Sequence, residues 1–260
     1  MYNNLADTRI TLEEVKQDPV VQRIIEELKP IFLMLSGSHN FGFPSSNSDL
    51  DIKGVFVRPT DDIVGFGRVS PVYEYKEGEL YDIALDEIGH NIGLVANSNG
   101  NRIEWPHSNL IIHESPEFPE YKKLIMNSSV SRQLFNHYSN FARDTYSDTK
   151  TNKKGVKRDL YTIRVYMTGI HALETGELVT DVNILNQQHQ LPIVNQMIIE
   201  KQLNGEHAER KAYSRQSVDE AVAYLETRLQ QAFVASSLPT TPNRETLNQY
   251  LIQTRKHNFI

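Results

Sequence analysis

The stretch that decides the fold is LSGSHNFGFPSSNSDLDIKGVFV, residues 35–57. Two aspartates, Asp49 and Asp51, stand one residue apart just before an apolar run that is typical of a buried strand. Successive side chains on a strand alternate between its faces, so both carboxylates point the same way, with Cα atoms roughly 6.5 Å apart. Two like charges on a half-buried strand repel each other and raise the cost of folding. We therefore expect a cation or hydrogen-bond donors that compensate them.

Length and composition exclude several classes of protein. The chain has 260 residues, enough for one large domain or two smaller ones. It has no cysteine, which excludes disulfides, thiolate metal sites and a cysteine nucleophile. The first residues, MYNNLADTRITLEEV, lack a basic start followed by an apolar segment, and no apolar run approaches the roughly 20 residues that span a bilayer. We therefore expect a cytoplasmic protein with no membrane partner, and the sequence does not predict its oligomeric state.

The net charge of −6 is unevenly distributed. The first 120 residues carry 9 basic and 20 acidic residues, a net −11, and the rest carry 18 and 13, a net +5. An acidic first part can bind cations, and a mildly basic second part can face phosphate. The overall balance argues against a dedicated binder of duplex DNA.

Periodicity predicts a sheet in the first part of the chain. Asp18 and Pro19 suit the N-cap and first position of a helix that ends before Pro30. Asp86 suits the N-cap of a second helix. Strands are expected at three places, the last of which is a pair joined by a turn: 31–35, 50–57 and 72–85.

The second part of the chain is expected to be mainly helical. Candidate helices lie at 118–145, 156–175, 190–204, 217–235 and 243–254. A linker is expected between Trp105 and Glu120, where three prolines, at positions 106, 116 and 119, break any helix. The expected class is α/β (α+β): a mixed-sheet domain at 1–115 followed by a mainly helical domain at 116–260.

The quoted stretch also predicts a chemistry. Two carboxylates on one face can share two divalent ions about 3.5 to 4 Å apart, and oxygen ligands favour Mg²⁺, with Mn²⁺ as an alternative. The preceding strand ends at Gly37 and Ser38, where a glycine allows close approach of the backbone and a serine offers its N–H and its hydroxyl. A phosphate-binding turn beside a metal-binding strand is the arrangement that phosphoryl or nucleotidyl transfer requires.

These residues carry a resemblance to a known group of enzymes. The Gly37-Ser38 pair, ten intervening residues and then Asp49-Leu50-Asp51 resemble the signature of the DNA polymerase beta-like nucleotidyltransferase superfamily. The wider string, through KGVFV, is most similar to the bacterial and phage "predicted nucleotidyltransferase" group, which includes RNA-repair-associated polymerase-beta-like proteins. The signature covers only residues 35–57. Weaker similarity continues over 81–83, 100–104 and 157–176.

The resemblance implies a third carboxylate on a later strand, which completes the metal site and helps to deprotonate the attacking hydroxyl. Asp82 is the best candidate, because LYDIAL places one acid inside an apolar strand. Asp86 and Glu79 are alternatives, although the first suits a helix cap and the second lies by the hairpin turn. A structural role for Asp82, and a solubilising role for the paired aspartates at a strand edge, stay open.

A basic segment near residue 157 predicts nucleotide binding. In a helix that begins at residue 156, Lys157, Tyr161 and Arg164 recur on one stripe beside an apolar one. Such a stripe can hold a triphosphate or an RNA backbone, with the tyrosine available for stacking. The alternative is an ordinary amphipathic surface helix.

The expected function is metal-dependent transfer of a nucleoside monophosphate from a nucleoside triphosphate (NTP) to a hydroxyl, with release of pyrophosphate. Asp49, Asp51 and Asp82 would be the catalytic, metal-binding residues, and Gly37, Ser38 and the basic stripe would bind the nucleotide. The acceptor is open, because an RNA 3′ end, a protein hydroxyl and a small alcohol suit the same chemistry. Two rivals remain: an inactive nucleotide-binding or antitoxin-like partner, and a phosphohydrolase, which usually adds histidine ligands.

Overall fold

The computed structural model describes residues 11–78, 80–151, 155–205 and 208–257. The chain forms two compact units, each built from separated segments. Of the described residues, the sheet unit comprises 11–37, 49–130 and 241–257, and the helical unit comprises 38–48 and 131–240. The two units thus interrupt each other along the chain. The expected domains, 1–115 and 116–260, divide the chain by a single cut and stay a prediction.

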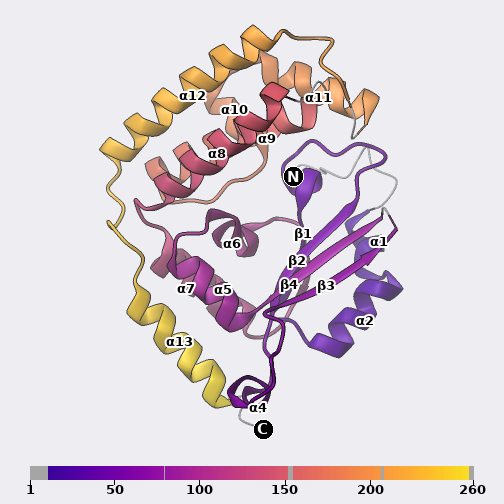
Figure 1. Cartoon of the computed structure of the whole chain (residues 1–260), viewed down its shortest axis with the longest axis vertical. Helices are drawn as coiled ribbons and strands as arrows, with labels where there is room; N and C mark the ends of the chain where they lie inside the picture. Colours follow the sequence, from indigo (N-terminus) through magenta and orange to yellow (C-terminus); the bar gives the residue numbers. More distant parts are fainter. Residues whose placement is uncertain (1–10, 79, 152–154, 206–207, 258–260) are drawn as a thin grey trace. The chain divides into compact units, whose positions relative to one another are not determined.

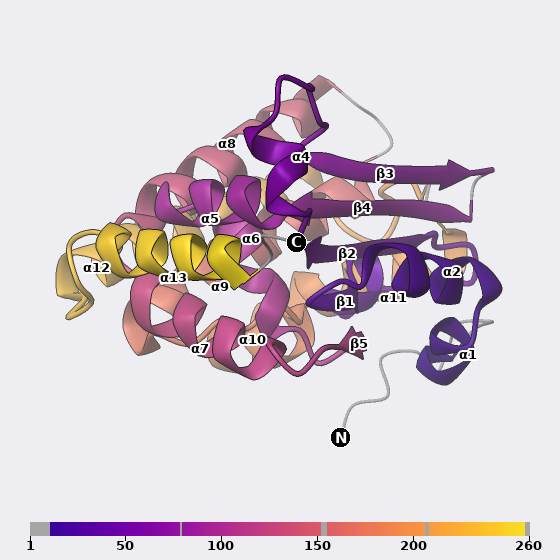
Figure 2. The ribbon, with the colours of Figure 1, turned by 90° about the horizontal axis from the view of Figure 1, so that it is seen from below.

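A mixed sheet is the core of the sheet unit. Its five described strands lie in the order β3-β4-β2-β1-β5, which can be followed down Figure 2. Their bounds are β1 Phe32–Leu35, β2 Leu50–Phe56, β3 Val72–Glu77, β4 Tyr81–Glu87 and β5 Ile111–Glu114. β2 and β4 run parallel, and the other neighbouring pairs are antiparallel. The sheet and its helices confirm the expected α/β class.

Helix α2, Pro19–Leu28, lies on one face of the sheet. Its N-cap is Asp18, as the sequence predicts, and one carboxylate oxygen of this residue accepts hydrogen bonds from the first N–H groups of the helix. The other carboxylate oxygen accepts a hydrogen bond of 2.6 Å from the hydroxyl of Tyr81 on β4. The cap therefore also ties the helix to the sheet. Helix α1, Leu12–Lys16, precedes it.

Helices α5, Ile88–Ala96, and α7, Phe118–Ser129, pack on the opposite face. The ring of Phe32 on β1 lies 5.0 and 5.7 Å from the rings of Phe118 and Tyr121 of α7. Along β1, Phe32 and Met34 alternate with Leu33 and Leu35, which point to the other face, so the strand is buried on both sides. The remaining helices of this unit are α4 Thr60–Val64, α6 Gly100–Glu104, η1 Trp105–His107 and α13 Arg244–His257.

Helix α9 is the centre of the helical unit (Figure 1). Fourteen of its residues are buried, which explains why it packs against several helices at once. The helices of this unit are α8 Leu134–Thr151, α9 Val156–Thr175, α10 Val182–His189, α11 Pro192–Asn204 and α12 Arg215–Ala235. The short helix α3, Gly37–Asn40, begins at the last residue of a sheet-unit segment. No helix in the described part of the chain is long and apolar enough to cross a membrane.

One expected helix is wrong in its bounds, and another helix was not expected. The predicted helix at 118–145 is two helices, because the chain leaves the helical conformation at Val130, and the hydroxyl of Ser129 donates to the carbonyl of Ile125 at 2.5 Å and so competes with further turns. The sequence pattern also did not predict α10, which is only eight residues long and has Asp181 as its N-cap.

Asp86 does not cap a helix, contrary to expectation. The parallel ladder between β2 and β4 continues to the pair Phe56 and Glu87, so Asp86 lies within the strand. Glu87 caps α5 instead, and its carboxylate accepts a hydrogen bond of 2.8 Å from the N–H of Gly89. The helix therefore starts one residue later than expected, because strand pairing holds Asp86 in β4. A local sequence pattern carries no information about that pairing.

Candidate active site

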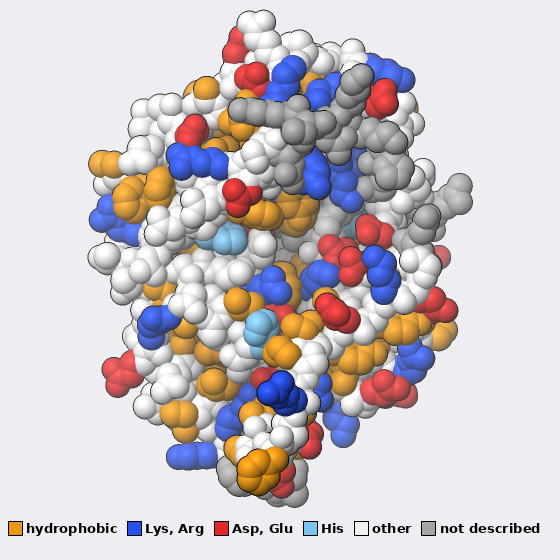
Figure 3. All heavy atoms as spheres, in the orientation of Figure 1, with side chains coloured by type: hydrophobic (Ala, Val, Ile, Leu, Met, Phe, Trp, Pro, Cys, Tyr) orange, Lys and Arg blue, Asp and Glu red, His pale blue; other side chains and the backbone are white. Residues whose placement is uncertain are grey.

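The two neighbouring strands β2 and β4 bring the predicted carboxylates together. Asp49, Asp51 and Lys53 alternate along β2 and its approach, so they share one face. Asp82 of β4 is the register partner of Asp51, and partners in adjacent strands lie about 5 Å apart with side chains on the same face. We call Asp49, Asp51, Lys53 and Asp82 the carboxylate face. On the side drawn in Figure 3, acidic and basic side chains lie next to one another over the strands.

A lysine side chain supplies the positive charge on this face. The Nζ atom of Lys53 lies 2.7 Å from Oδ1 of Asp51 and 3.7 Å from Oδ1 of Asp82. The side chains of Lys53, Asp51 and Asp82 are 17%, 23% and 50% exposed. Lys53 is a residue of this face that the Asp49-x-Asp51 motif does not include, and its place two residues after Asp51 is the signal that could have found it, because the same alternation puts it on that face.

Burial raises the pKa of the Asp51 carboxyl above its ordinary value. The Lys53 ammonium opposes this shift, whereas the nearby carboxylates of Asp82 and Asp49 add to it. The net direction is upward, so the negative charge on Asp51 is incompletely compensated by Lys53 alone. This is the electrostatic condition under which an additional cation would bind favourably.

The turn after β1 packs directly against the Asp51 carboxylate. Gly37 has φ +60°, a conformation that favours glycine. A Cβ atom at this position would lie 3.0 Å from Oδ2 and 3.1 Å from Cβ of Asp51. The N–H of Ser36 donates to the carbonyl of Asp51 at 2.6 Å, which fixes the turn against β2. Glycine is therefore required at residue 37 both by its backbone conformation and by the nearness of the carboxylate.

Ser38 begins the loop 38–48, which belongs to the helical unit. Its hydroxyl donates to the hydroxyl of Ser48 at 3.0 Å, and the N–H of Ser45 donates to the same Ser48 oxygen at 3.0 Å. The fully buried Lys201 of α11 donates to the hydroxyl of Ser45 at 2.8 Å. In this structure the Ser38 hydroxyl thus helps to hold the loop. The assignment of Gly37 and Ser38 to phosphate stays a prediction.

The predicted basic stripe lies on α9, in the helical unit, and is less exposed than a surface helix would be. Lys157 and Tyr161 are half-buried, and Arg164 is fully buried. The guanidinium carbon of Arg164 lies 4.0 Å from the ring centroid of Phe41 and 5.1 Å from that of Tyr161. Arg164 therefore supports Phe41 of the loop 38–48. A nucleotide-binding role for these three residues stays a prediction.

A second carboxylate on the same face of the sheet has other partners. Asp86 is fully buried and accepts hydrogen bonds from Nε of Arg102 at 3.0 Å and from the amide of Asn91 at 3.1 Å. The amide oxygen of Asn91 in turn accepts one from the hydroxyl of Tyr121 at 2.6 Å. We call these four residues the Asp86 cluster. Its polar groups are paired with each other, which makes Asp86 a structural carboxylate. Glu79, the other alternative, lies outside the described residues.

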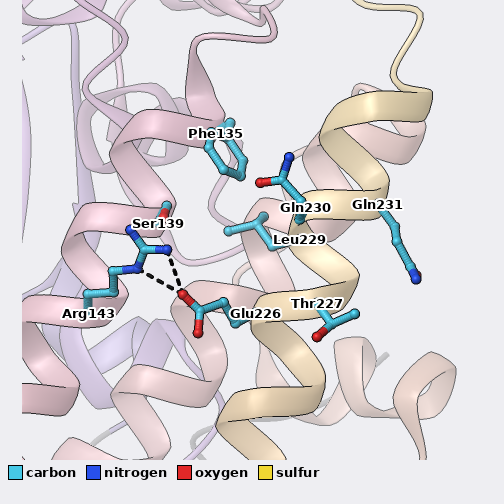
Figure 4. A pocket seen from close by; sticks show the side chains of 8 residues that line it. All are labelled: Phe135, Ser139, Arg143, Glu226, Thr227, Leu229, Gln230 and Gln231. Atoms are coloured by element: carbon cyan, nitrogen blue, oxygen red, sulfur yellow. Dashed lines mark hydrogen bonds and ion pairs between the residues drawn. The ribbon is translucent and has the colours of Figure 1, made fainter.

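Two cavities are lined by none of the residues of the carboxylate face. The first, about 390 Å³, lies between α8 and α12 and is lined by the ion pair of Arg143 and Glu226, whose atoms are 2.6 Å apart (Figure 4). The second, about 880 Å³, lies in the sheet unit beside Ile31 and Tyr250. Neither cavity contains a predicted catalytic residue.

The donor set suits a hard divalent cation. Within the described residues, no three or more histidine, cysteine, aspartate or glutamate side chains are grouped so that they could hold a metal ion. Asp51 and Asp82, however, already share one cationic group, the Lys53 ammonium, and their ligands are carboxylate oxygens. Two oxygen donors on neighbouring strands, with Asp49 two residues away, are the ligand type that Mg²⁺ takes. The carboxylate oxygens of these residues are therefore of the type that would ligate Mg²⁺.

The glycine turn, the paired aspartates that follow it and the acid on the adjacent strand are an arrangement similar to that of polymerase-beta-like nucleotidyltransferases. The chain belongs to the RNA repair pathway DNA polymerase beta family, whose model matches residues 9–253. This finding confirms the superfamily that the Gly37-Ser38 and Asp49-x-Asp51 signature predicts, and it extends the match over nearly the whole chain.

Two relatives are similar over large parts of the chain. The uncharacterized protein YcgL of Bacillus subtilis is 24% identical over 252 residues, which cover 90% of this chain and 95% of that protein. The uncharacterized protein MJ0002 of Methanocaldococcus jannaschii is 28% identical over 160 residues, 58% of this chain, and the match spans 63% of that protein. No solved structure matches the chain.

Proposed function

We propose that the protein transfers a nucleoside monophosphate from an NTP to a hydroxyl acceptor and releases pyrophosphate. The observation that carries the proposal is the register of Asp51 with Asp82 on parallel strands, next to a glycine turn so close to Asp51 that a Cβ atom on Gly37 would lie 3.0 Å from its carboxylate. Family membership supports a nucleotidyltransferase.

The carboxylate face supplies the groups that the reaction needs. Asp49 and Asp51, with Asp82, would hold Mg²⁺, which neutralises phosphate charge and polarises the α-phosphate when bound. Asp82 is half exposed, so it can accept a proton from the acceptor hydroxyl and pass it to water. The hydroxyl oxygen bonds to the α-phosphorus, the bond to the oxygen that bridges to the β-phosphorus breaks, and pyrophosphate leaves with the electron pair.

Five residues are the proposed nucleotide-binding group. Gly37, in the sheet unit, offers backbone close to Asp51, and Ser38 follows it in the chain. Lys157, Tyr161 and Arg164 are the candidates on α9. Since Arg164 is buried under Phe41, we expect Lys157 and Tyr161 to affect nucleotide affinity more than it does.

We propose an RNA 3′ end as the acceptor, because the description of the family refers to an RNA repair pathway. Mg²⁺ and each of the four α-labelled NTPs are incubated with the protein and RNA that ends in a free 3′-hydroxyl. Parallel reactions contain RNA with a blocked 3′ end or no RNA. The proposal expects label on the free-ended RNA alone, together with pyrophosphate.

Two variants control this experiment. Asp82→Asn should reduce transfer by about 10²-fold or more, since it removes the proposed proton acceptor. Asp62→Asn changes an exposed acid on α4 in the same way and should leave the rate unchanged. Label on the protein band would mean that a protein hydroxyl, and not RNA, is the acceptor. Absence of label with every NTP would reject the transferase assignment.

A further inference from the structure

Lys53 occupies a position that a metal ion would also need. Its ammonium lies within 4 Å of two carboxylates from neighbouring strands, at 2.7 Å from Asp51 and 3.7 Å from Asp82. The lysine is itself on β2, so its backbone is fixed by the sheet, and only the head of the side chain needs to move in order to leave the pair.

An ammonium and a divalent ion compete for the same pair of carboxylates, because two cations at contact distance repel each other. Two acids in register repel each other, and a cation between them removes that repulsion. A lysine head is a compact charge on a flexible stem, and its attachment to the chain keeps it within reach of the carboxylates. A free metal ion must therefore compete with a cation that never diffuses away.

We propose that Lys53 is a built-in counter-ion that competes with the divalent ion for Asp51 and Asp82 and is released when the ion binds. The proposal rests on the function proposed above. Once released, the ammonium is available to the anionic phosphates that the nucleotide brings with the ion. Metal alone then binds weakly, whereas metal and nucleotide together bind cooperatively, since the displaced charge finds a new partner.

Lys53→Met is the direct test, with Mn²⁺ as the probe and the electron paramagnetic resonance signal of free Mn²⁺ as the readout. Without nucleotide, the variant should bind Mn²⁺ about tenfold more tightly than the wild type, a factor that allows for partial screening of the charge by solvent. Lys53→Arg keeps the cation and should bind Mn²⁺ as weakly as the wild type. Lys53→Gln repeats the neutral substitution if the methionine variant does not fold.

Lys76→Met is the matched control. Lys76 stands directly opposite Asp82 on β3, and its side chain is exposed, so this change removes one positive charge near the same acids without removing the contact with Asp51. We expect a change in Mn²⁺ affinity below about threefold, as for an exposed charge. An equal gain from Lys76→Met and Lys53→Met would mean that net charge, and not displacement, sets the affinity, and would overturn the proposal.

A non-hydrolysable NTP analogue provides the second readout. It should tighten Mn²⁺ binding to the wild type by a larger factor than to Lys53→Met, because only the wild type has an ammonium to release. Equal Mn²⁺ affinities in the wild type and Lys53→Met, with label transfer intact, would overturn the role of Lys53 alone. Failure of both proteins to bind Mn²⁺, with no label transfer, would overturn the proposed function as well.

Discussion

Two carboxylates on the same face of one sheet, Asp86 and Asp51, have very different surroundings. Asp86 is fully buried and is held by the planar guanidinium of Arg102 and the amide of Asn91. Asp51 keeps 23% of its side chain exposed, and its charge is matched by the flexible side chain of Lys53. The two acids are on adjacent strands, and only what packs around them differs.

The difference separates a structural acid from one that can exchange its partner. The Asp86 cluster satisfies its own hydrogen bonds inside the core, so a ligand would have to break several contacts to reach it. The Asp51 carboxylate faces the Lys53 ammonium and a second acid, Asp82, and a metal ion would have to displace only that one side-chain head. Partner rigidity and exposure, and not the type of residue, distinguish the two.

Asp51→Asn should have the largest effect, a loss of catalysis without a loss of stability. Loss of a metal-binding carboxylate should reduce transfer by about 10³-fold, at the upper end of what removal of one electrostatic group costs. Label transfer to RNA at saturating NTP measures this loss. Residual transfer within tenfold of the wild type would remove Asp51 from the metal site.

The same variant should remain folded. The folded-state pKa of Asp51 is raised, so its ionised form is disfavoured in the fold and weakens stability at pH values above the ordinary aspartate value of 3.8. Asp51→Asn should therefore be at least as stable as the wild type at neutral pH without metal, and any gain should shrink as the pH falls toward 3.8. Urea unfolding at several pH values tests the sign.

Arg102→Met should have the next largest effect, and only on stability. It strands the Asp86 carboxylate in the core, and breaking such a pair costs roughly 3 kcal/mol of unfolding free energy. The side chain of Arg102 is 26% exposed, which places the expected loss at the lower end of the range for buried pairs. Denaturant unfolding measures it.

Two variants control the Arg102 result. Arg68→Met, an exposed position in the same unit, should leave the free energy of unfolding unchanged. The double variant Arg102→Met with Asp86→Asn should recover part of the lost stability, since it removes the stranded charge. A loss in the single variant no larger than that of Arg68→Met would mean that the Asp86 cluster does not stabilise the fold.

Gly37→Ala should have the smallest effect. The positive φ costs an alanine roughly 1 to 2 kcal/mol, and its Cβ would press on the Asp51 carboxylate. Gly78→Ala is the matched control, because Gly78 has φ +57° and nothing within 4 Å of its Cβ position. Both variants should lose similar stability, and only Gly37→Ala should also weaken Mn²⁺ binding. Equal Mn²⁺ affinities would mean that the turn does not position Asp51.

Much of the fold was predictable because its signals are local. The cap at Asp18, the strand pair at 72–85 and the helix at 156–175 follow from single residues and short periods, and the structure has them at nearly the same positions. The wrong expectations concern features that depend on contacts between residues far apart in the sequence. Asp86 was expected to cap a helix, but ladder pairing with β2 kept it in the strand.

The candidate site shows the same division. The spacing within 35–57 was sufficient to place Asp49, Asp51 and Gly37 on one turn and strand, because the alternation of side chains along a strand is fixed by covalent geometry. Asp82 was a candidate from its strand alone, and nothing local indicated which residue of β2 it would face. The role of Arg164 was judged from its helical stripe, which does not reveal that Phe41 of the loop 38–48 covers it.

The sequence by itself determined the family, the strand that carries the paired aspartates and the glycine turn before it, since each depends on residues close together in the chain. Only the tertiary structure decided that Asp82 is in register with Asp51, that Lys53 lies between them and that Asp86 is closed off by Arg102. Those three facts depend on which strands and helices meet, and that is set by burial and pairing across the whole sheet rather than by any short pattern.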